Sequence, residues 1–298
     1  MSDQKKKKRS WGDTRYGRRV KDVTGLQVIM ANLFPNRTDC EVCLQDELDV
    51  TELLKYVEKK NAQHPEYKTT VFHCVVAAVD RMVRERPLMN RYVQGRRFYE
   101  RDEVSISFVA KRRFADGADE ALMVLVPKDT DTIDDISKKI YGDVTRTREH
   151  EHAVDGLDKI MDGLAKLPRP LLMLVVKIVR ILDFWGHCPA ALSDGDPNYT
   201  TVLLSNLGSI KCPSVYHHLN NYGTNSIMVT VGTYHKESKV MPDGTTEIRD
   251  VLDIAATLDE RIADGFYFAR SLKLIKHICA NPELLDRPLG ESSEFDYK

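Results

Sequence analysis

Cysteine and histidine are the residue types of this 298-residue chain that could bind a metal ion, and the sequence holds 6 and 9 of them. Cys40 and Cys43 form one CxxC pair. A zinc site needs a second such pair, or a histidine pair with suitable spacing. The tight histidine clusters are His150/His152 and His217/His218. We predict no metal site, and we expect the cysteines to be reduced thiols that pack as small apolar residues.

Basic residues recur between residues 157 and 186, at Lys166, Arg169, Lys177 and Arg180. Their spacing places them on one stripe of a helix whose remaining surface is apolar, with a break at two prolines. The longest uncharged run is far too short to span a bilayer. Two hypotheses remain. The helix is buried in the core or in a subunit interface, or it lies on a membrane surface with its basic stripe toward the headgroups.

The charge balance excludes some classes of partner. The chain has 44 Lys and Arg against 45 Asp and Glu, so its net charge is -1, and we expect no nucleic-acid partner. The mean hydropathy is -0.39 and no run of 18 apolar residues occurs, which predicts no transmembrane helix. The N-terminus is basic but lacks the apolar stretch of a secretory signal, so we expect a cytoplasmic protein.

The elements that must position these residues can be predicted from periodicity. We expect helices over residues 22–34, 51–61, 71–85, 133 into the 140s, and 264–285, and strands over 39–49, 201–208, 226–235 and 247–259. Residues 96–114 alternate and predict a hairpin, followed by a strand at 120–127. This mixture indicates an α+β fold in which helices pack on a sheet. Residues 1–19 are predicted to be a basic, mobile arm or a docking arm for an acidic partner, a membrane surface or nucleic acid, and 291–298 a short tail.

Three stretches together resemble the acyltransferase core of 2-oxo acid dehydrogenase complexes and its relative, chloramphenicol acetyltransferase. They are DELDVTELLKYVEKKN followed by the apolar helix from Val71, the LSNLG run at 204–208, and DERIADG at 259–265, which is similar to the family's DHRxxDG. The likeness covers residues 22–286. It implies a two-layer sandwich of a mixed sheet and helices over residues 20–290, with an added helical insertion at about 150–196. The chain shows no lipoyl domain and no flexible linker.

The resemblance also implies a chemistry. Members are CoA-dependent acyltransferases and homotrimers, with active sites between adjacent subunits. The family's histidine is a general base, and a Ser or Thr of the SNLG region, here Ser205, donates a hydrogen bond to the oxyanion. The Asp of the DG pair, here Asp264, holds the shape of the site. Asn206, Gly208 and Gly265 are carried over as substrate-binding positions.

The position of the family's catalytic histidine is Glu260 in this chain. An unperturbed Glu, with a pKa of about 4.3, is a poorer base at neutral pH than an imidazole at about 6.5, unless burial raises its pKa. His218 could replace the imidazole, and His217 could contact substrate. In an extended segment the two would point to opposite faces, so one at most should reach the site. Alternatively they are a structural or surface pair.

Two functions follow. Either the chain transfers an acyl group from acyl-CoA to a small hydroxyl, amine or thiol acceptor, with Glu260 or His218 as the base, or it is an inactive trimeric scaffold that lost the base. Neither hypothesis requires a permanently bound cofactor. Contact with a membrane surface through residues 157–186 is a third, separate hypothesis.

Overall fold

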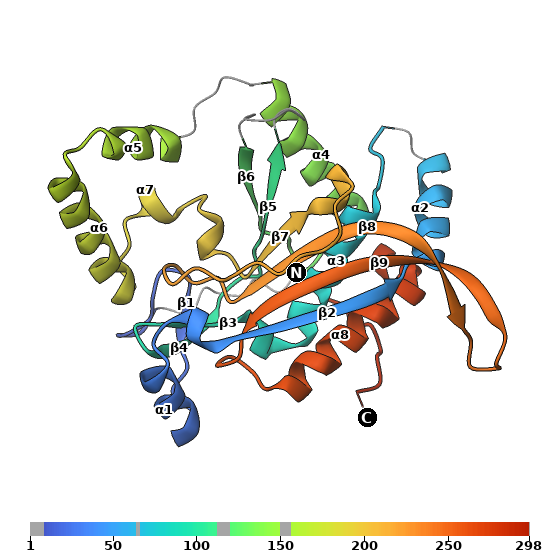
Figure 1. The fold of residues 1–298 in the computed structure, drawn as a ribbon, viewed down its shortest axis with the longest axis horizontal. Coiled ribbons are helices and arrows are strands. Elements are labelled where there is room, and N and C mark those ends of the chain that lie inside the picture. The colour runs from blue at the N-terminus through green and yellow to red at the C-terminus, as the bar shows by residue number, and fades with distance from the viewer. Residues whose placement is uncertain (1–8, 64–65, 112–119, 150–155, 298) are drawn as a thin grey trace.

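The computed structural model of the chain describes residues 9–63, 66–111, 120–149 and 156–297. Figure 1 shows the arrangement of its helices and strands. The strands are β1 (Gly17–Arg19), β2 (Glu41–Asp49), β3 (Arg91–Gln94), β4 (Arg97–Arg101), β5 (Ile106–Lys111), β6 (Glu120–Leu125), β7 (Val202–Asn206), β8 (Ile227–Val240) and β9 (Thr246–Asp259). The helices are α1 (Gly25–Leu33), α2 (Thr51–Gln63), α3 (Val71–Glu85), α4 (Ile133–Glu149), α5 (Gly156–Ala165), α6 (Arg169–Phe184), α7 (Ala190–Ser193) and α8 (Gly265–Ala280).

Six strands form the large sheet, in the order β2-β9-β8-β7-β5-β6. The pairs β5/β7 and β7/β8 are parallel, and the pairs β2/β9, β8/β9 and β5/β6 are antiparallel. Helices α3 and α8 bury their apolar residues against this sheet in one continuous core. The predicted α+β class, a two-layer sandwich of a mixed sheet and helices, is confirmed.

Helix α3 is the central helix of this core. The Thr70 side chain caps it by accepting a hydrogen bond from the His73 backbone N–H. Every residue from His73 to Val83 is buried. Two of these are charged: Asp80 pairs with Arg84, and Arg81 donates hydrogen bonds to backbone carbonyls of the C-terminal segment, including Leu284 and Arg287. Burial of a charged side chain is tolerated here because each one has a partner.

The predicted hairpin over residues 96–114 is wrong. Strand β4 pairs with β3 and β1 in a separate three-stranded sheet, whereas β5 pairs with β6 and β7 in the large sheet. The chain changes sheets at residues 102–105. Arg101, at the end of β4, is buried and donates hydrogen bonds to the carbonyls of Tyr199 and Thr200, just before β7. These bonds attach the end of β4 to a segment that local alternation cannot reveal.

Both terminal segments are packed on the domain where the structure describes them. Residues 17–19, which the sequence predicted to be part of a mobile arm, form β1 on β4, and the buried Thr14 hydroxyl bonds to that of Tyr92. At the other end Ser293 is buried and donates hydrogen bonds to the Glu85 carboxylate through its backbone N–H and its hydroxyl. Residues 1–8, which hold the lysine run, lie outside the described residues.

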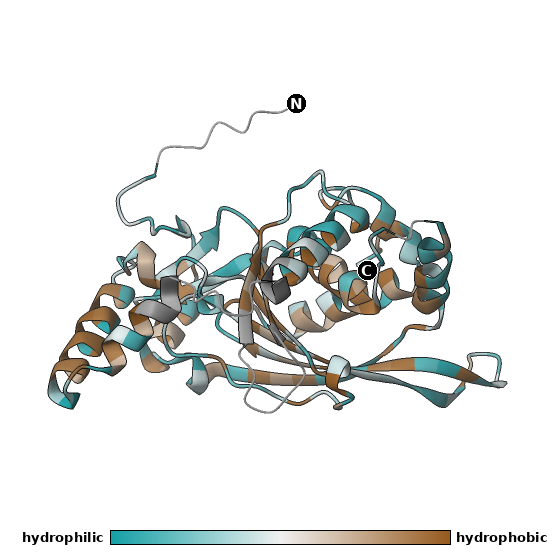
Figure 2. Cartoon of the chain, turned by 90° about the horizontal axis from the view of Figure 1, so that it is seen from above, coloured by the Kyte–Doolittle hydropathy of each residue, from teal (hydrophilic) through white to brown (hydrophobic). Residues whose placement is uncertain are grey.

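Helices α5 and α6 lie at one end of the molecule, away from α2, α3 and α8 (Figure 1). Hydropathy colouring shows α6 as an apolar helix projecting at that end (Figure 2). Asp183 is its one buried residue, so residues 169–184 are not part of the core of this chain. In the part of the chain that the structure describes, none of the helices combines the length and apolar character required to cross a bilayer.

Candidate functional site

The motif around Ser205 lies at the end of β7. Ser205 is half-buried, and its hydroxyl forms no hydrogen bond with any described residue. The next residue, Asn206, caps a short 3-10 turn, with its side-chain oxygen accepting from the Ser209 N–H. A Cβ atom on Gly208 would lie 2.4 Å from the Gly232 carbonyl oxygen, so only glycine fits there. Asn206 and Gly208 therefore shape the turn that leaves the Ser205 hydroxyl available as a donor.

The second motif, DERIADG, begins at the end of β9. Asp259 and Arg261 form a buried ion pair with two parallel hydrogen bonds of 2.7 and 2.8 Å, and Arg261 also donates to the Phe34 carbonyl. Burial alone lowers the pKa of this guanidinium, but the bonds to Asp259 outweigh it, and the net pKa is raised. The pair fixes the backbone on both sides of Glu260, whose side chain faces solvent.

Glu260 is held at the edge of the sheet by its backbone N–H, which donates to the Cys40 carbonyl oxygen at 2.9 Å. The adjacent thiol is a poor alternative nucleophile, because burial raises the pKa of Cys40 to about 11. Asp264 caps α8, accepting a hydrogen bond from the Tyr267 N–H at 2.8 Å. The resemblance implies an Asp that holds the site's shape through an ion pair; in the structure Asp264 is the N-cap of α8 and forms no ion pair with another described residue. A Cβ atom on Gly265 would meet no atom within 4 Å.

Ser205 and Glu260 are far apart along the strands of the large sheet. The strand register aligns Ser205 with Thr230 of β8, and Thr230 with Ala255 of β9. Glu260 follows Ala255 by five residues, so it lies about 16 Å further along the strand direction, at about 3.3 Å per residue. A hydrogen bond or a shared substrate atom within one chain is excluded at that separation. The two groups can act on one substrate only if they come from different copies of the chain.

His217 and His218 lie in an irregular, exposed segment before β8. The prediction that they point to opposite faces is wrong, because the segment is not an extended strand. Their ring centroids are 5.0 Å apart. The His218 Nδ1 lies 3.2 Å from the Leu219 carbonyl oxygen. A carbonyl oxygen can only accept, so this contact is a hydrogen bond in the tautomer with the proton on Nδ1, in which Nε2 is the acceptor of the ring.

The histidine segment meets the sheet at the Glu260 end. The Leu219 N–H donates to the Glu41 carboxylate at 2.6 Å, and Glu41 is paired with Asp259 across β2 and β9. His218 precedes Leu219, and Glu260 follows Asp259. The structure thus brings both candidate bases, Glu260 and His218, to the β2 edge of the sheet, whereas Ser205 lies on the interior strand β7.

Two buried charged residues hold the histidine segment, and the sequence analysis missed both. The Arg37 guanidinium donates to the carbonyls of Asn220, Tyr222 and Gly223, and burial lowers its pKa. The Asp183 carboxylate, at the end of α6, accepts from the Gly223 N–H at 3.0 Å. One signal was available for Asp183, because it is the one acidic residue within the α6 sequence.

Comparison with known proteins identifies a family. The model of the 2-oxoacid dehydrogenases acyltransferase catalytic domain matches residues 19–159 and 190–286, and residues 160–189 fall between the matched segments. The chain is 23% identical over 261 residues to the lipoamide acyltransferase component of the branched-chain alpha-keto acid dehydrogenase complex of Bacillus subtilis. That match covers 86% of this chain and 51% of the relative, so the chain spans about half of the relative's length.

Solved structures with a similar fold carry related names. A probable dihydrolipoamide acetyltransferase from Listeria monocytogenes superposes with a TM-score of 0.57 at 16% identity, covering 95% of this chain and 99% of that one. The dihydrolipoamide acetyltransferase of Azotobacter vinelandii gives 0.59 at 15% identity, covering 90% and 94%. The fold, the order of the motifs and the match over most of the chain agree. This chain belongs to the family of 2-oxoacid dehydrogenase acyltransferase catalytic domains.

Proposed function

We propose that this chain is a cytoplasmic acyltransferase that moves an acyl group from acyl-CoA to a small acceptor, at sites shared between the subunits of a homotrimer. The observation that carries the proposal is the separation of Ser205 from Glu260, about 16 Å along the strands of one sheet, with His218 at the Glu260 side. A site between two copies can combine the Ser205 end of one with the Glu260 end of the next. The Azotobacter vinelandii structure was solved to investigate a serine, a histidine and an asparagine in its mechanism. Its histidine and asparagine are four residues apart, as Glu260 and Asp264 are.

The reaction assigned to these groups is acyl transfer by general-base catalysis. Glu260 or the His218 Nε2 removes a proton from the hydroxyl, amine or thiol of the acceptor. The acceptor atom attacks the thioester carbonyl and forms the new bond, and the bond to the CoA sulfur breaks as the thiol is released with a proton. The Ser205 hydroxyl of the neighbouring copy donates a hydrogen bond to the oxyanion. Removing a donor of this kind costs about 10²–10³ in rate.

The test is release of free CoA thiol from acetyl-CoA and longer acyl-CoAs, with a panel of hydroxyl, amine and thiol acceptors. Glu260→Gln and His218→Asn each remove one candidate base, and the true base should cost about 10²–10⁴ in kcat. Glu103→Gln and His235→Asn, at exposed positions outside the motifs, are the matched controls. If wild type turns over and neither base variant slows it tenfold, both base assignments are wrong.

The alternative function is an inactive trimeric scaffold, and the observation that favours it is the glutamate in place of the family's histidine. It predicts no thiol release from any acyl-CoA by the wild-type chain. Glu260→His restores the family motif at an exposed position where the larger ring meets no packing constraint. Under the scaffold hypothesis this variant gains activity that the wild type lacks, whereas under the enzyme hypothesis the wild type is already active.

A further inference from the structure

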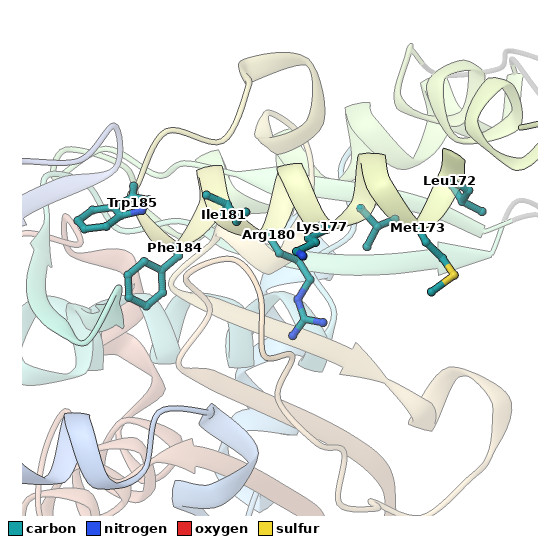
Figure 3. Close-up of a pocket in the computed structure, with 8 residues that line it drawn as sticks. Leu172, Met173, Lys177, Arg180, Ile181, Phe184 and Trp185 are labelled. Carbon is teal, nitrogen blue, oxygen red and sulfur yellow. The ribbon is translucent and has the colours of Figure 1, made fainter. Parts of the chain in front are cut away.

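The exposed surface of α6 carries large apolar side chains along the length of the helix. Met173 is 62% exposed and Ile181 51%, and the helix continues into Trp185, which is 60% exposed. An open groove of about 650 Å³ runs along this face, and its walls are residues of α6 together with Trp185 (Figure 3). A site for a small molecule is normally enclosed by several elements. A groove whose walls come from one helix is instead a surface that a larger partner covers.

The charges on this segment have a single sign. Between Asp162 and Asp183 the sequence contains four charged residues, and all are basic: Lys166, Arg169, Lys177 and Arg180. All four are exposed, and none forms an ion pair with another described residue. Figure 3 shows Lys177 and Arg180 projecting from the same side of α6 as Met173 and Phe184. The partner must therefore present an apolar surface together with negative charge.

The helix is attached to the domain at its C-terminal end. The buried Asp183 carboxylate accepts hydrogen bonds from the Tyr199 hydroxyl at 2.8 Å and from the Gln94 amide at 3.0 Å. The backbone approaches closely as well, because a Cβ atom on Gly95 would lie 2.3 Å from the Phe184 carbonyl oxygen. This attachment holds α6 in a fixed orientation and prevents it from leaving the surface as a free peptide.

We propose that α6 docks in the plane of a membrane surface that contains anionic lipids. Its apolar side chains would enter the boundary between headgroups and acyl chains, and Lys177 and Arg180 would extend to phosphate groups. Trp185 at the end of the helix suits that boundary, because an indole has an apolar ring and one N–H donor. A helix of 16 residues is about 24 Å long, shorter than the roughly 30 Å of hydrocarbon that a spanning helix must cross.

Charge complementarity argues against a second copy of the chain as the occupant. Two α6 helices packed face to face would bring Lys177 and Arg180 of each copy together, and like charges in a desolvated contact cost several kcal/mol. The segment also falls outside the residues that match the family model, so a subunit contact shared by the family does not account for it. The proposed docking does not depend on the proposed acyl transfer, and its tests require no activity measurement.

The experiment is flotation of the full chain with vesicles of phosphatidylcholine alone and of phosphatidylcholine with 30% phosphatidylglycerol. We expect binding to the anionic vesicles that weakens with added salt. Lys177→Gln with Arg180→Gln should weaken binding roughly 30-fold, because each basic residue near an anionic surface contributes about fivefold. Lys59→Gln with Lys138→Gln removes the same charge from exposed positions on α2 and α4, and it should leave binding within twofold.

The apolar part is tested by Met173→Gln with Ile181→Gln, which should abolish flotation. The control is Val240→Gln with Ile248→Gln, at exposed apolar positions on β8 and β9. The chain has 2 tryptophans, so Trp11→Phe leaves Trp185 as the fluorescent reporter, and its emission should shift to the blue when vesicles are added. Light scattering of every variant without lipid reports its oligomeric state.

Three results would overturn the proposal. The first is absence of binding to anionic vesicles at low salt. The second is binding that is lost on deletion of residues 1–8 but unchanged in both α6 variants, which would assign it to the lysine run. The third is a change of oligomeric state caused by Met173→Gln with Ile181→Gln, which would make a second copy of the chain the occupant of the groove.

Discussion

Helices α1 and α6 are attached to the same small sheet, and both leave apolar side chains in solvent. The buried Val93 packs with Ala31 of α1, and the next residue of β3, Gln94, bonds to Asp183 of α6. Successive side chains of a strand point to opposite faces, so the two helices occupy opposite sides of the sheet at one end of the molecule (Figure 1). On α1, Leu26 is 70% exposed and Ile29 61%, values as high as those on α6.

The two helices differ in charge. The sequence of α1, GLQVIMANL, has no ionisable side chain, whereas α6 carries Lys177 and Arg180 in the middle of its exposed face. Residues 19–159, which include α1, match the family model, and residues 160–189 do not. Exposed apolar area alone does not identify a partner. An uncharged face in the shared part of the fold fits a subunit contact, and a basic face in the added part fits an anionic surface.

The largest effect is expected from charging α1. Leu26→Asp with Ile29→Asp places two carboxylates in the proposed subunit contact, where unpaired buried charge is strongly unfavourable. We expect the trimer to dissociate to monomers at micromolar concentration, as measured by light scattering. Thiol release should fall with the loss of the trimer, because the proposed site combines groups from two copies.

The matched comparison is Met173→Gln with Ile181→Gln, which should leave the trimer intact and abolish vesicle flotation. The α1 variant should retain vesicle binding per chain. A wild-type chain that is monomeric, or an α1 variant that remains a trimer, contradicts the assignment of α1 to the subunit contact.

The next largest effect is expected from removing the attachment of α6. Asp183→Ala removes the acceptor of three hydrogen bonds, from the Tyr199 hydroxyl, the Gln94 amide and the Gly223 N–H. Leaving these buried donors unsatisfied should lower the free energy of unfolding by about 3 kcal/mol, measured in urea. Asp162→Ala, at an exposed position on α5, is the control and should stay within about 0.5 kcal/mol. Equal effects of the two substitutions would show that α6 is not attached through Asp183.

The N-terminal segment contacts the regions where α1 and α6 attach to the domain, which gives a third test. Strand β1 pairs with β4 beside α1, and a Cβ atom on Gly186, just after α6, would lie 2.6 Å from the Thr14 side chain. Deletion of residues 1–19 should lower the free energy of unfolding by about 2 kcal/mol and the melting temperature by roughly 5 °C. Deletion of residues 1–8 should change neither. Identical melting of the two truncated chains would mean that residues 9–19 are not docked.

Local periodicity was enough to predict the main helices and the long strands. The apolar run of α3 with its Thr70 cap, and the alternation of β9, are signals contained within a dozen residues. The change of sheet between β4 and β5 has no such signal, because it depends on Arg101 reaching carbonyls about 100 residues away. Charged residues such as Arg37 and Arg81 resemble surface positions in any local pattern, yet each is buried against backbone carbonyls.

The candidate site likewise combines features that the sequence predicted with features that it could not predict. The motifs located Ser205, Glu260 and Asp264, but the 16 Å offset between the first two follows only from the order and register of β7, β8 and β9. The orientation of His217 and His218 could not be predicted because Arg37 and Asp183, distant in sequence, hold that segment in an irregular path. Long-range hydrogen bonds to backbone groups, rather than side-chain pattern, set the geometry of the site.

The smallest effect is expected from the titration of His73, and it defines the pH range in which the variants of α1 and α6 can be compared. His73 on α3 is buried, its Nδ1 has no hydrogen-bond partner among the described residues, and burial lowers its pKa to about 4. The unfolded chain binds this proton near pH 6.5, so between pH 6.5 and 4 the unfolded state holds more protons and stability falls as pH falls. From pH 7.5 to 5.5 the loss is about 1.4 kcal/mol. His73→Leu removes this titration. The unfolding free energy of the variant minus that of the wild type should therefore be about 1.4 kcal/mol larger at pH 5.5 than at pH 7.5. A difference that is constant across this range would mean that the folded and unfolded chains bind this proton at the same pH, and vesicle and light-scattering measurements at pH 5.5 would then be as reliable as those at pH 7.5.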